Sequence, residues 1–276
     1  MADIKKVKNN SQKNKRPIGV FDSGVGGLSV LKELHKILPN EDFVFLADQK
    51  YVPYGEKTKT ELISLVSKIT DYFIKNHDIK MMVVACNTAT CNAIAELRAK
   101  YSFPIVGTVP AVKLAASKSK SGMVAVICTP STSKSLVLKT LIKEHCAGVD
   151  VLNIGCKNLE NAVETGELEG AEVRKLLKKY LKDVVGSNTD HLVLGCTHYP
   201  FLKKSIQKIV GPNVKLLDGG KAIARRSKDL LKTNLYLNNK KKKGESVYMT
   251  TGDHLKFGEV ASFLLKRPIK AKKISI

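Results

Sequence analysis

The sequence has no tryptophan, 6% aromatic residues, and no apolar run near the roughly 20 residues that cross a bilayer. A transmembrane span is therefore not expected, and no membrane partner is predicted. Residues 1–16 are rich in lysine and asparagine and lack the apolar segment of a secretory signal. These absences predict a soluble protein of the cytoplasm.

Cofactor signatures are also missing. The six cysteines contain no C-x-x-C pair and have too few histidines beside them for a zinc site. The glycine-rich segment Phe21–Gly27 is not G-x-G-x-x-G, and no P-loop lysine comes after it. We therefore predict no cofactor and no metal. Four cysteines fall in helix or strand patterns and are interpreted as small buried hydrophobes: Cys91, Cys128, Cys146 and Cys156.

Acidic residues are few, and the formal net charge is +22. A charge of this size raises nucleic acid as a partner. The lysines, however, are spread along helix faces or gathered in residues 1–16 and in Lys240–Lys243, which we interpret as a disordered arm and a solvated loop. The scarcity of aromatic residues also argues against the base stacking that single-strand binders use. Nucleic acid therefore remains a secondary alternative.

Short apolar runs alternate with helical periodicity along most of the 276 residues. This alternation is typical of an α/β fold with parallel sheets and crossover helices, and the length fits two domains. The runs interpreted as strands are 18–21, 43–46, 81–85, 105–106, 123–127, 149–152, 192–194, 214–217 and 246–250. The segments interpreted as helices are 28–38, 60–75, 90–101, 133–145, 171–185, 201–210, 221–237 and 254–265.

The two halves of the chain repeat the same patterns. Ile18–Ser23 has the same shape as Val124–Thr129, and the run that ends at Cys86 matches the run that ends at Cys196. We therefore predict two similar parallel-sheet domains related by a pseudo-two-fold axis, with the active site in the cleft between them. The expected boundaries are 1–16 for a disordered basic tail, 17–110 with 219–276 for a discontinuous first domain, and 111–218 for the second domain.

Cys86 and Cys196 each come after an apolar run and a small residue, and each precedes a hydroxyl residue. Such a run is typical of a buried strand that ends at the carboxyl edge of a sheet, where open α/β sheets bind ligands. Two such edges that face each other would hold a small molecule between two thiols. One thiol could remove a proton from a carbon while the other returns a proton to the opposite face. This pattern predicts a racemase with two bases.

Further polar residues lie close to these cysteines or in the glycine-rich loop. Asp22 could meet a substrate ammonium or accept a proton, and Ser23 could donate to a carboxylate; alternatively, Asp22 only caps a helix. His198 is a candidate for exchanging protons with the thiols, although it could also be a structural hydrogen bonder. In Pro53–Tyr54–Gly55, Tyr54 could cover the cleft and the Gly55 N–H could bind a carboxylate, although a plain turn uses the same residues.

At these motifs the chain closely resembles the glutamate racemases of the aspartate/glutamate racemase superfamily, over residues 17–265. The resemblance rests on Gly19–Leu28, Pro53–Gly55, Ala85–Ala89, Gly195–Pro200 and Thr251–Asp253. It implies Cys86 and Cys196 as the two bases, assisted by Asp22 and His198, and D-glutamate made for peptidoglycan. It further implies that the substrate contacts Asp22, Ser23, Tyr54, Gly55, Asn87, Thr88, Thr197 and His198.

Two other functions stay open. A racemase for aspartate or another amino acid would share the same thiols, because the sequence does not reveal the length of the cleft. A basic nucleic-acid-binding protein on a racemase fold would have no turnover. The expected partner is thus a small molecule, L- or D-glutamate, and a homodimer is the expected assembly.

Overall fold

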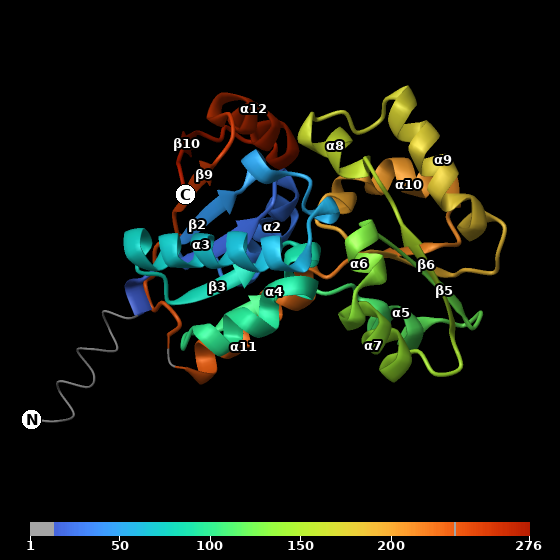
Figure 1. Cartoon of the computed structure of the whole chain (residues 1–276), viewed down its shortest axis with the longest axis horizontal. Coiled ribbons are helices and arrows are strands. Elements are labelled where there is room, and N and C mark those ends of the chain that lie inside the picture. The colour runs from blue at the N-terminus through green and yellow to red at the C-terminus, as the bar shows by residue number, and fades with distance from the viewer. Residues whose placement is uncertain (1–13, 235) are drawn as a thin grey trace, which may run out of the picture.

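Two α/β units lie side by side in the computed structural model, which describes residues 14–234 and 236–276 (Figure 1). The first unit contains a six-stranded sheet and the second a four-stranded sheet. Every strand pairing in both sheets is parallel. This confirms the expected fold class of two parallel-sheet domains. The basic tail expected at residues 1–16 lies outside the described residues up to position 13.

The first sheet has the order β10-β9-β2-β1-β3-β4. Its strands are β1 (Ile18–Asp22), β2 (Phe43–Ala47), β3 (Met81–Val84), β4 (Ile105–Gly107), β9 (Ser246–Thr250) and β10 (Ala271–Lys273). The two strands nearest the carboxyl terminus therefore extend the edge of a sheet that the amino-terminal part of the chain begins.

The second sheet has the order β6-β5-β7-β8. Its strands are β5 (Met123–Cys128), β6 (Asp150–Gly155), β7 (His191–Leu194) and β8 (Lys215–Leu217). This order is the same as β2-β1-β3-β4 in the first sheet, with β5 in the place of β1 and β7 in the place of β3. The repeated order agrees with the repeated sequence patterns. Strands β3 and β7, which precede Cys86 and Cys196, thus occupy equivalent positions.

Helices cover both faces of each sheet. In the first unit, α3 (Lys59–His77) and α4 (Asn87–Lys100) pack on one face, and α2 (Leu28–Ile37), α11 (Gly220–Thr233) and α12 (His254–Leu265) on the other. In the second unit, the covering helices are α5 (Val112–Lys118), α6 (Pro130–Lys134), α7 (Leu136–His145), α8 (Leu159–Glu164), α9 (Ala171–Val185) and α10 (Lys203–Val210). Short 3-10 helices are η1 (Val25–Gly27), η2 (Gln49–Tyr51), η3 (Tyr54–Glu56) and η4 (Tyr199–Leu202).

One hydrophobic cluster joins the two units. Ile18 and Val20 of β1 point into the same cluster as Ala125 and Ile127 of β5, whereas Phe21 points to the opposite face of its sheet. This alternation results from the two-residue period of strand side chains. Because apolar burial is the main favourable term in folding, the shared cluster fixes the sheets against each other. The carboxyl edges of both sheets then lie on either side of one site.

Most predicted elements agree with the structure, but some do not. The sequence patterns missed β10, α5 and α8, which are three to seven residues long and too short for a clear period. The helix expected at 201–210 begins only at Lys203, because Pro200 and its neighbours form η4. The helix expected at 133–145 is divided, since α6 ends at Lys134 and Ser135 caps α7.

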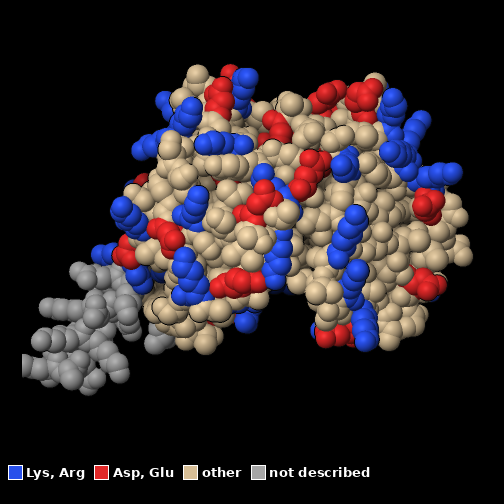
Figure 2. All heavy atoms as spheres, in the orientation of Figure 1, with Lys and Arg blue, Asp and Glu red and all other residues tan. Residues whose placement is uncertain are grey.

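Lysine and arginine side chains are distributed over both units on the face shown in Figure 2, with aspartate and glutamate between them. Many of these charges are paired; Lys204 and Lys208, for example, both contact Glu169. Within residues 14–234 and 236–276, no helix is long and apolar enough to cross a membrane.

Candidate active site

Cys86 and Cys196 occupy matching positions at the ends of the two sheets. Each is the second residue after its strand, β3 or β7, and the residue between continues the ladder by donating its N–H to a central strand. The Ala85 N–H donates to the Phe21 carbonyl at 2.8 Å, and the Gly195 N–H donates to the Ile127 carbonyl at 2.7 Å. Sheet geometry therefore fixes the backbone of both cysteines.

The chain takes different conformations immediately after the two cysteines. Cys86 caps α4, and its Sγ accepts a hydrogen bond from the Ala89 N–H at 3.4 Å. Cys196 is succeeded by Thr197 and His198 and then by η4, and the next α-helix begins only at Lys203. A helix dipole acts within its first turn, so it can act on Cys86, at the start of α4, but not on Cys196.

Both thiols line one cavity between the two units. The exposed fraction is 5% for Cys86 and 7% for Cys196, and the cavity has a volume of about 20 Å³. It also brings together seven of the eight predicted substrate contacts. The lining residues are Ser23, Val52, Pro53, Tyr54, Gly55, Cys86, Asn87, Thr88, Thr129, Glu160, Cys196, Thr197 and His198.

Around Cys86 the surroundings favour a neutral thiol. Burial, and to a lesser extent the Asp22 charge, raise the pKa of Cys86 well above its ordinary value. The Ser23 Oγ lies 3.7 Å from the Cys86 Sγ, and the two groups form a hydrogen bond in which either can donate. A buried sulfur with these partners holds its proton at neutral pH.

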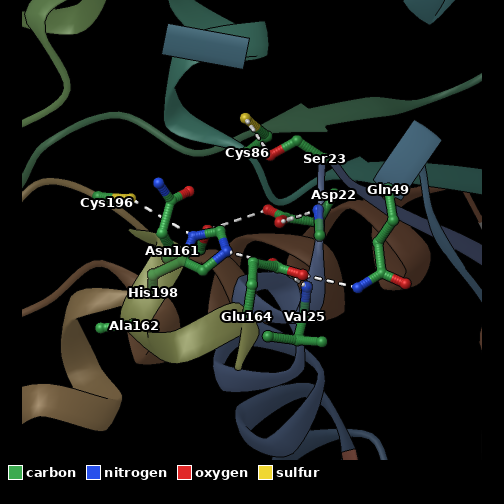
Figure 3. A network of polar contacts seen from close by, with 12 residues as sticks. Asp22, Ser23, Val25, Gln49, Cys86, Asn161, Ala162, Glu164, Cys196 and His198 are labelled. Atoms are coloured by element: carbon green, nitrogen blue, oxygen red, sulfur yellow. Dashed lines mark hydrogen bonds and ion pairs between the residues drawn. The ribbon is translucent and has the colours of Figure 1, made fainter. Parts of the chain in front are cut away.

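A cation lies next to Cys196. The His198 Nδ1 is 3.6 Å from the Cys196 Sγ, and the His198 Nε2 is 2.6 Å from the Glu164 Oε1 (Figure 3). Burial lowers the pKa of His198, but the hydrogen bonds to Cys196 and Glu164 outweigh this effect and raise it well above the ordinary value. His198 is therefore protonated at neutral pH, between a sulfur and a carboxylate.

Glu164 anchors this cation to the first unit. Its carboxylate accepts from the Val25 N–H at 2.7 Å and from the Gln49 Nε2 at 2.6 Å, in addition to His198 (Figure 3). Burial opposes the charge, yet the contacts with His198 and Gln49 lower the pKa of Glu164 below its ordinary value. An ionised carboxylate thus holds His198 in place within the second unit, and its contacts with Val25 and Gln49 tie it to the first unit.

The glycine-rich loop after β1 lies close to the Glu164 and His198 side chains. A Cβ atom at Gly24 would overlap the Glu164 carboxylate, and one at Gly26 would overlap the His198 ring. The glycines therefore let side chains of the second unit reach the loop backbone. In the structure, the side chains of Glu164 and His198 make this close approach.

Asp22 lies behind the cavity wall and is fully buried. Its Oδ1 accepts from the Gly24 N–H and its Oδ2 from the Thr197 Oγ1, each at 3.0 Å. Burial raises the pKa of Asp22 to about 6, although the nearby His198 charge and these hydrogen bonds oppose the shift. Asp22 therefore holds both the loop and Thr197, from opposite units, in fixed positions.

Tyr54 and Gly55 lie in η3 and close one side of the cavity. The Tyr54 hydroxyl donates to the Asp48 Oδ2 at 2.6 Å, and the Thr251 hydroxyl donates to the Asp48 Oδ1 at 2.7 Å. A Cβ atom at Gly55 would lie 3.0 Å from the Thr129 side chain, so the second unit presses against this loop. Tyr54 is buried here, and its role in covering the cleft stays a prediction.

Hydroxyl groups of the two units contact each other across the cleft near the start of α4. The Thr88 Oγ1 lies 2.8 Å from the Thr129 Oγ1 and 3.2 Å from the Thr132 Oγ1. Asn87 precedes Thr88 in the first turn of α4 and faces the same cavity. This side of the cavity therefore offers donors suited to a carboxylate.

Several residues in or around the cavity were not found by sequence reasoning; of these, Glu160 and Thr129 line it. Glu160 and Glu164 lie four residues apart on α8, a helix of six residues that gave no periodic signal. Thr129 and Asp48 come directly after strands and Gln49 comes one residue later, and only their place at a strand end could have indicated them. In the described part of the chain, no group of three or more metal-ligating side chains is arranged around a metal site.

The fold and site together define a two-domain α/β protein with two buried thiols at equivalent strand ends around one cavity. The chain belongs to the Asp/Glu/Hydantoin racemase family, whose model matches residues 18–226. Its relatives include glutamate racemases. One, from Herpetosiphon aurantiacus, is 39% identical over 249 residues, which are 90% of this chain and 98% of that protein.

Solved structures lead to the same family. A glutamate racemase of Bacillus anthracis superposes with a TM-score of 0.87 at 30% identity, covering 95% of this chain and 98% of the other. The Francisella tularensis glutamate racemase in complex with D-glutamate gives a TM-score of 0.82 at 32% identity, with the same coverage. The fold and family implied by the sequence motifs are thus confirmed.

Proposed function

We propose that this chain is a glutamate racemase that interconverts L- and D-glutamate without a cofactor, with Cys86 and Cys196 as the two bases. The observation that carries the proposal is the placement of both thiols at equivalent strand ends around one cavity. The names of its relatives and the D-glutamate bound to the Francisella tularensis structure support glutamate as the substrate.

The reaction needs one thiolate and one thiol. The thiolate takes the hydrogen of the substrate α-carbon as a proton, and the C–H electron pair delocalises into the α-carboxylate. The thiol on the opposite face then delivers its proton to the α-carbon, which gives the other enantiomer. The two sulfurs exchange protonation states in each turnover, so the product state is ready for the reverse reaction.

The charges around the sulfurs distinguish their resting states. A negative charge is better placed on Cys196, 3.6 Å from the His198 ring, than on Cys86, where burial and Asp22 oppose it. For the enantiomer whose α-hydrogen faces Cys196, Cys196 is the proton acceptor and Cys86 the donor, and the roles are reversed for the other enantiomer. Donors on Asn87, Thr88 and the start of α4 would hold the α-carboxylate as negative charge develops there.

The cavity must open before a substrate enters. At about 20 Å³ it has room for about one water molecule and not for glutamate. Opening requires the contacts between the units to break, including Thr88 with Thr129 and Gln49 with Glu164. Closure around the substrate would exclude water and so strengthen every polar contact in the site.

The cellular setting is also a proposal. We place the protein in the cytoplasm, where D-glutamate would be supplied for peptidoglycan synthesis, and expect a homodimer. We further propose a first domain of residues 17–110 with 219–276 and a second of residues 111–218. The shared sheet of β1 and β9 supports this division.

Polarimetry tests the function directly. The purified protein should convert L-glutamate and D-glutamate into the same racemic mixture without pyridoxal phosphate, nucleotide or metal, and should do so in a metal chelator. Both aspartate enantiomers serve as the comparison, because an aspartate racemase would use the same thiols. Full dependence on pyridoxal phosphate, or turnover of aspartate alone, would contradict the proposal.

Glu164→Gln should move the basic limb of the pH profile to lower pH. The raised pKa of His198 keeps this side chain protonated above neutral pH, and the cation is lost as pH rises through that pKa. Glutamine keeps the shape of Glu164 but removes the charge that stabilises the cation. A decrease of one pKa unit would lower kcat/KM about tenfold on the basic limb. The measurement is kcat/KM between pH 6 and 10.

Glu167→Gln is the matched control, because Glu167 is an exposed residue three positions further along the chain. This variant should keep the wild-type profile. An unchanged basic limb in Glu164→Gln would show that Glu164 does not set the protonation of His198.

A further inference from the structure

A second cavity, of about 790 Å³, lies at the amino ends of β9 and β10, on the opposite edge of the first sheet from the one that leads to Cys86. Three parts of the first unit form its walls: the end of α2, the segment that leads into β9, and the connection from α12 to β10 (Figure 1). A cavity of this volume can hold a small-molecule ligand. The proposed reaction does not use it.

The protein does not neutralise the positive charge of this wall. One carboxylate, Glu245, lines the cavity with the cations Lys32, Lys36, Lys243, Arg267 and Lys270. Lys36 pairs with Glu33 at 2.6 Å, whereas the other four cations form no ion pair with any carboxylate of residues 14–234 and 236–276. The ends of α2 and α12 contribute about half a negative charge each, so an excess of about two positive charges remains.

Arg267 is positioned by a neutral partner. Its Nη2 donates to the Tyr248 hydroxyl oxygen at 2.6 Å, and Tyr248 is 6% exposed. Burial raises the pKa of Tyr248, so the phenol keeps its proton and leaves the guanidinium charge intact. A guanidinium held in this way can offer paired N–H donors to a phosphate group.

The backbone next to Lys243 is also fixed. The Gly244 N–H donates to the Pro39 carbonyl at 2.9 Å, and the Phe43 N–H donates to the Glu245 carbonyl at 2.9 Å. These bonds attach the segment before β9 to the end of α2 and to the start of β2. The loop that the sequence suggested to be solvated is therefore held to the first unit at its last lysine, beside this cavity.

The ionisation of His35 reflects the charges around it. His35 lies in the same wall, with its Nε2 2.8 Å from the Ser246 Oγ. Burial, and then the charges of Arg267 and Lys243, lower the pKa of His35 to about 4. The imidazole is therefore neutral at physiological pH. An anion in the cavity would oppose the two cations and raise this pKa.

Linked phosphoryl groups have the charge and the acceptors that this wall lacks. They place several negative charges and many oxygen acceptors in one small molecule, and arginine and lysine are the side chains that bind phosphate. A single carboxylate carries one charge and cannot offset an excess of about two. A nucleic-acid duplex would need a contact surface of roughly 1,000 Å² or more, beyond what one cavity offers.

We propose that this cavity binds a small anion with two or more linked phosphoryl groups, held by Arg267 and by the unpaired lysines of its wall. The three walls are separate parts of the chain, so one phosphate group alone cannot contact all of their cations. The site lies at the other edge of the sheet from the thiols, and the inference does not depend on the proposed racemase reaction.

Isothermal titration calorimetry with inorganic tripolyphosphate, in phosphate-free buffer at physiological salt, tests this site. The full chain should bind one tripolyphosphate. Arg267→Gln should weaken binding about tenfold, because it removes a charge-assisted hydrogen bond. Lys243→Gln, which breaks no contact with another described residue, should weaken it about threefold. Lys178→Gln removes the same charge from exposed α9 and should leave the affinity within about twofold, since salt screens distant charges.

Two further measurements locate the ligand and define its class. The NMR signal of His35, identified with His35→Asn, should show a higher pKa when tripolyphosphate is bound. Orthophosphate should bind at least about tenfold more weakly, since it lacks the linked groups. Binding without saturation at one ligand per chain, or an equal loss in Lys178→Gln and the wall variants, would overturn the proposal. So would an unchanged His35 pKa, or tighter binding of a DNA duplex at equal phosphate concentration.

Discussion

Replacement of either Cys86 or Cys196 by serine should abolish racemisation, with kcat lowered ~10³-fold or more. A serine hydroxyl cannot take the place of a thiolate near neutral pH, because its proton is far less acidic. One remaining thiol can remove a proton from one face of the α-carbon but cannot return a proton to the other face. Polarimetry with each glutamate enantiomer measures the loss.

A reaction that needs only one base distinguishes the roles of the two thiols. A glutamate analogue with chloride on the β-carbon needs only one base: the α-proton leaves, a C=C bond forms and chloride departs with its electron pair. Cys86→Ser should therefore eliminate chloride from one enantiomer, and Cys196→Ser from the other. Chloride release with each enantiomer gives the measurement, and it also shows that the variants are folded.

Cys91→Ser provides the matched control, because Cys91 lies on α4 one turn beyond Cys86 and does not line the cavity. It should racemise glutamate at the wild-type rate. Wild-type racemisation by both active-site variants would show that the thiols are not the two bases.

The positions of the thiols could be predicted from the sequence because they depend on local patterns. The apolar runs before Cys86 and Cys196 form buried parallel strands, whose sequences are continuous hydrophobic segments. The carboxyl edge of such a sheet is a ligand site in open α/β folds, so the residues after each strand could be selected. Their arrangement around one cavity required the packing of two domains.

The partners of His198 could not be predicted in this way. Glu164 lies 34 residues from His198 in the sequence and reaches it from a six-residue helix. A helix of that length stays in place through tertiary contacts, such as those of Leu159 and Val163 in the shared hydrophobic cluster. In the sequence, the residues that make these contacts are isolated apolar residues without a helical period. Glu160 escaped detection for the same reason.

The burial of one lysine could not be predicted from the sequence, because the chain contains so many lysines. The sequence suggested solvated lysines along helix faces, and most charged pairs agree with this, but Lys80 is fully buried just before β3. Its Nζ lies 2.5 Å from the Glu41 Oε2, and it donates to the carbonyls of Asn14 at 2.6 Å and Tyr236 at 2.9 Å. In a chain with 47 lysines and arginines, composition does not distinguish this one residue.

Lys80→Met should destabilise the protein by about 3–5 kcal/mol, because it leaves the Glu41 carboxylate buried without its cation. The lysine ties Asn14 and Tyr236 to the start of β3, while the Glu41 Oε1 accepts from the Asn238 N–H at 2.7 Å. Loss of the cation therefore weakens contacts among three separate parts of the chain. Urea unfolding monitored by circular dichroism measures the change in the free energy of unfolding.

An exposed pair supplies the control. Lys100 contacts Asp71 at 3.3 Å, and both side chains are more than half exposed, so Lys100→Met should cost no more than about 1 kcal/mol. The double variant Lys80→Met with Glu41→Gln should recover part of the loss, since it removes the unpaired charge together with its partner. If Lys80→Met costs no more than Lys100→Met, the buried pair does not hold the amino-terminal segment and the 236–238 loop to the sheet. The racemase site lies at the opposite, carboxyl end of β3, so kcat of the folded Lys80→Met protein should stay at the wild-type value.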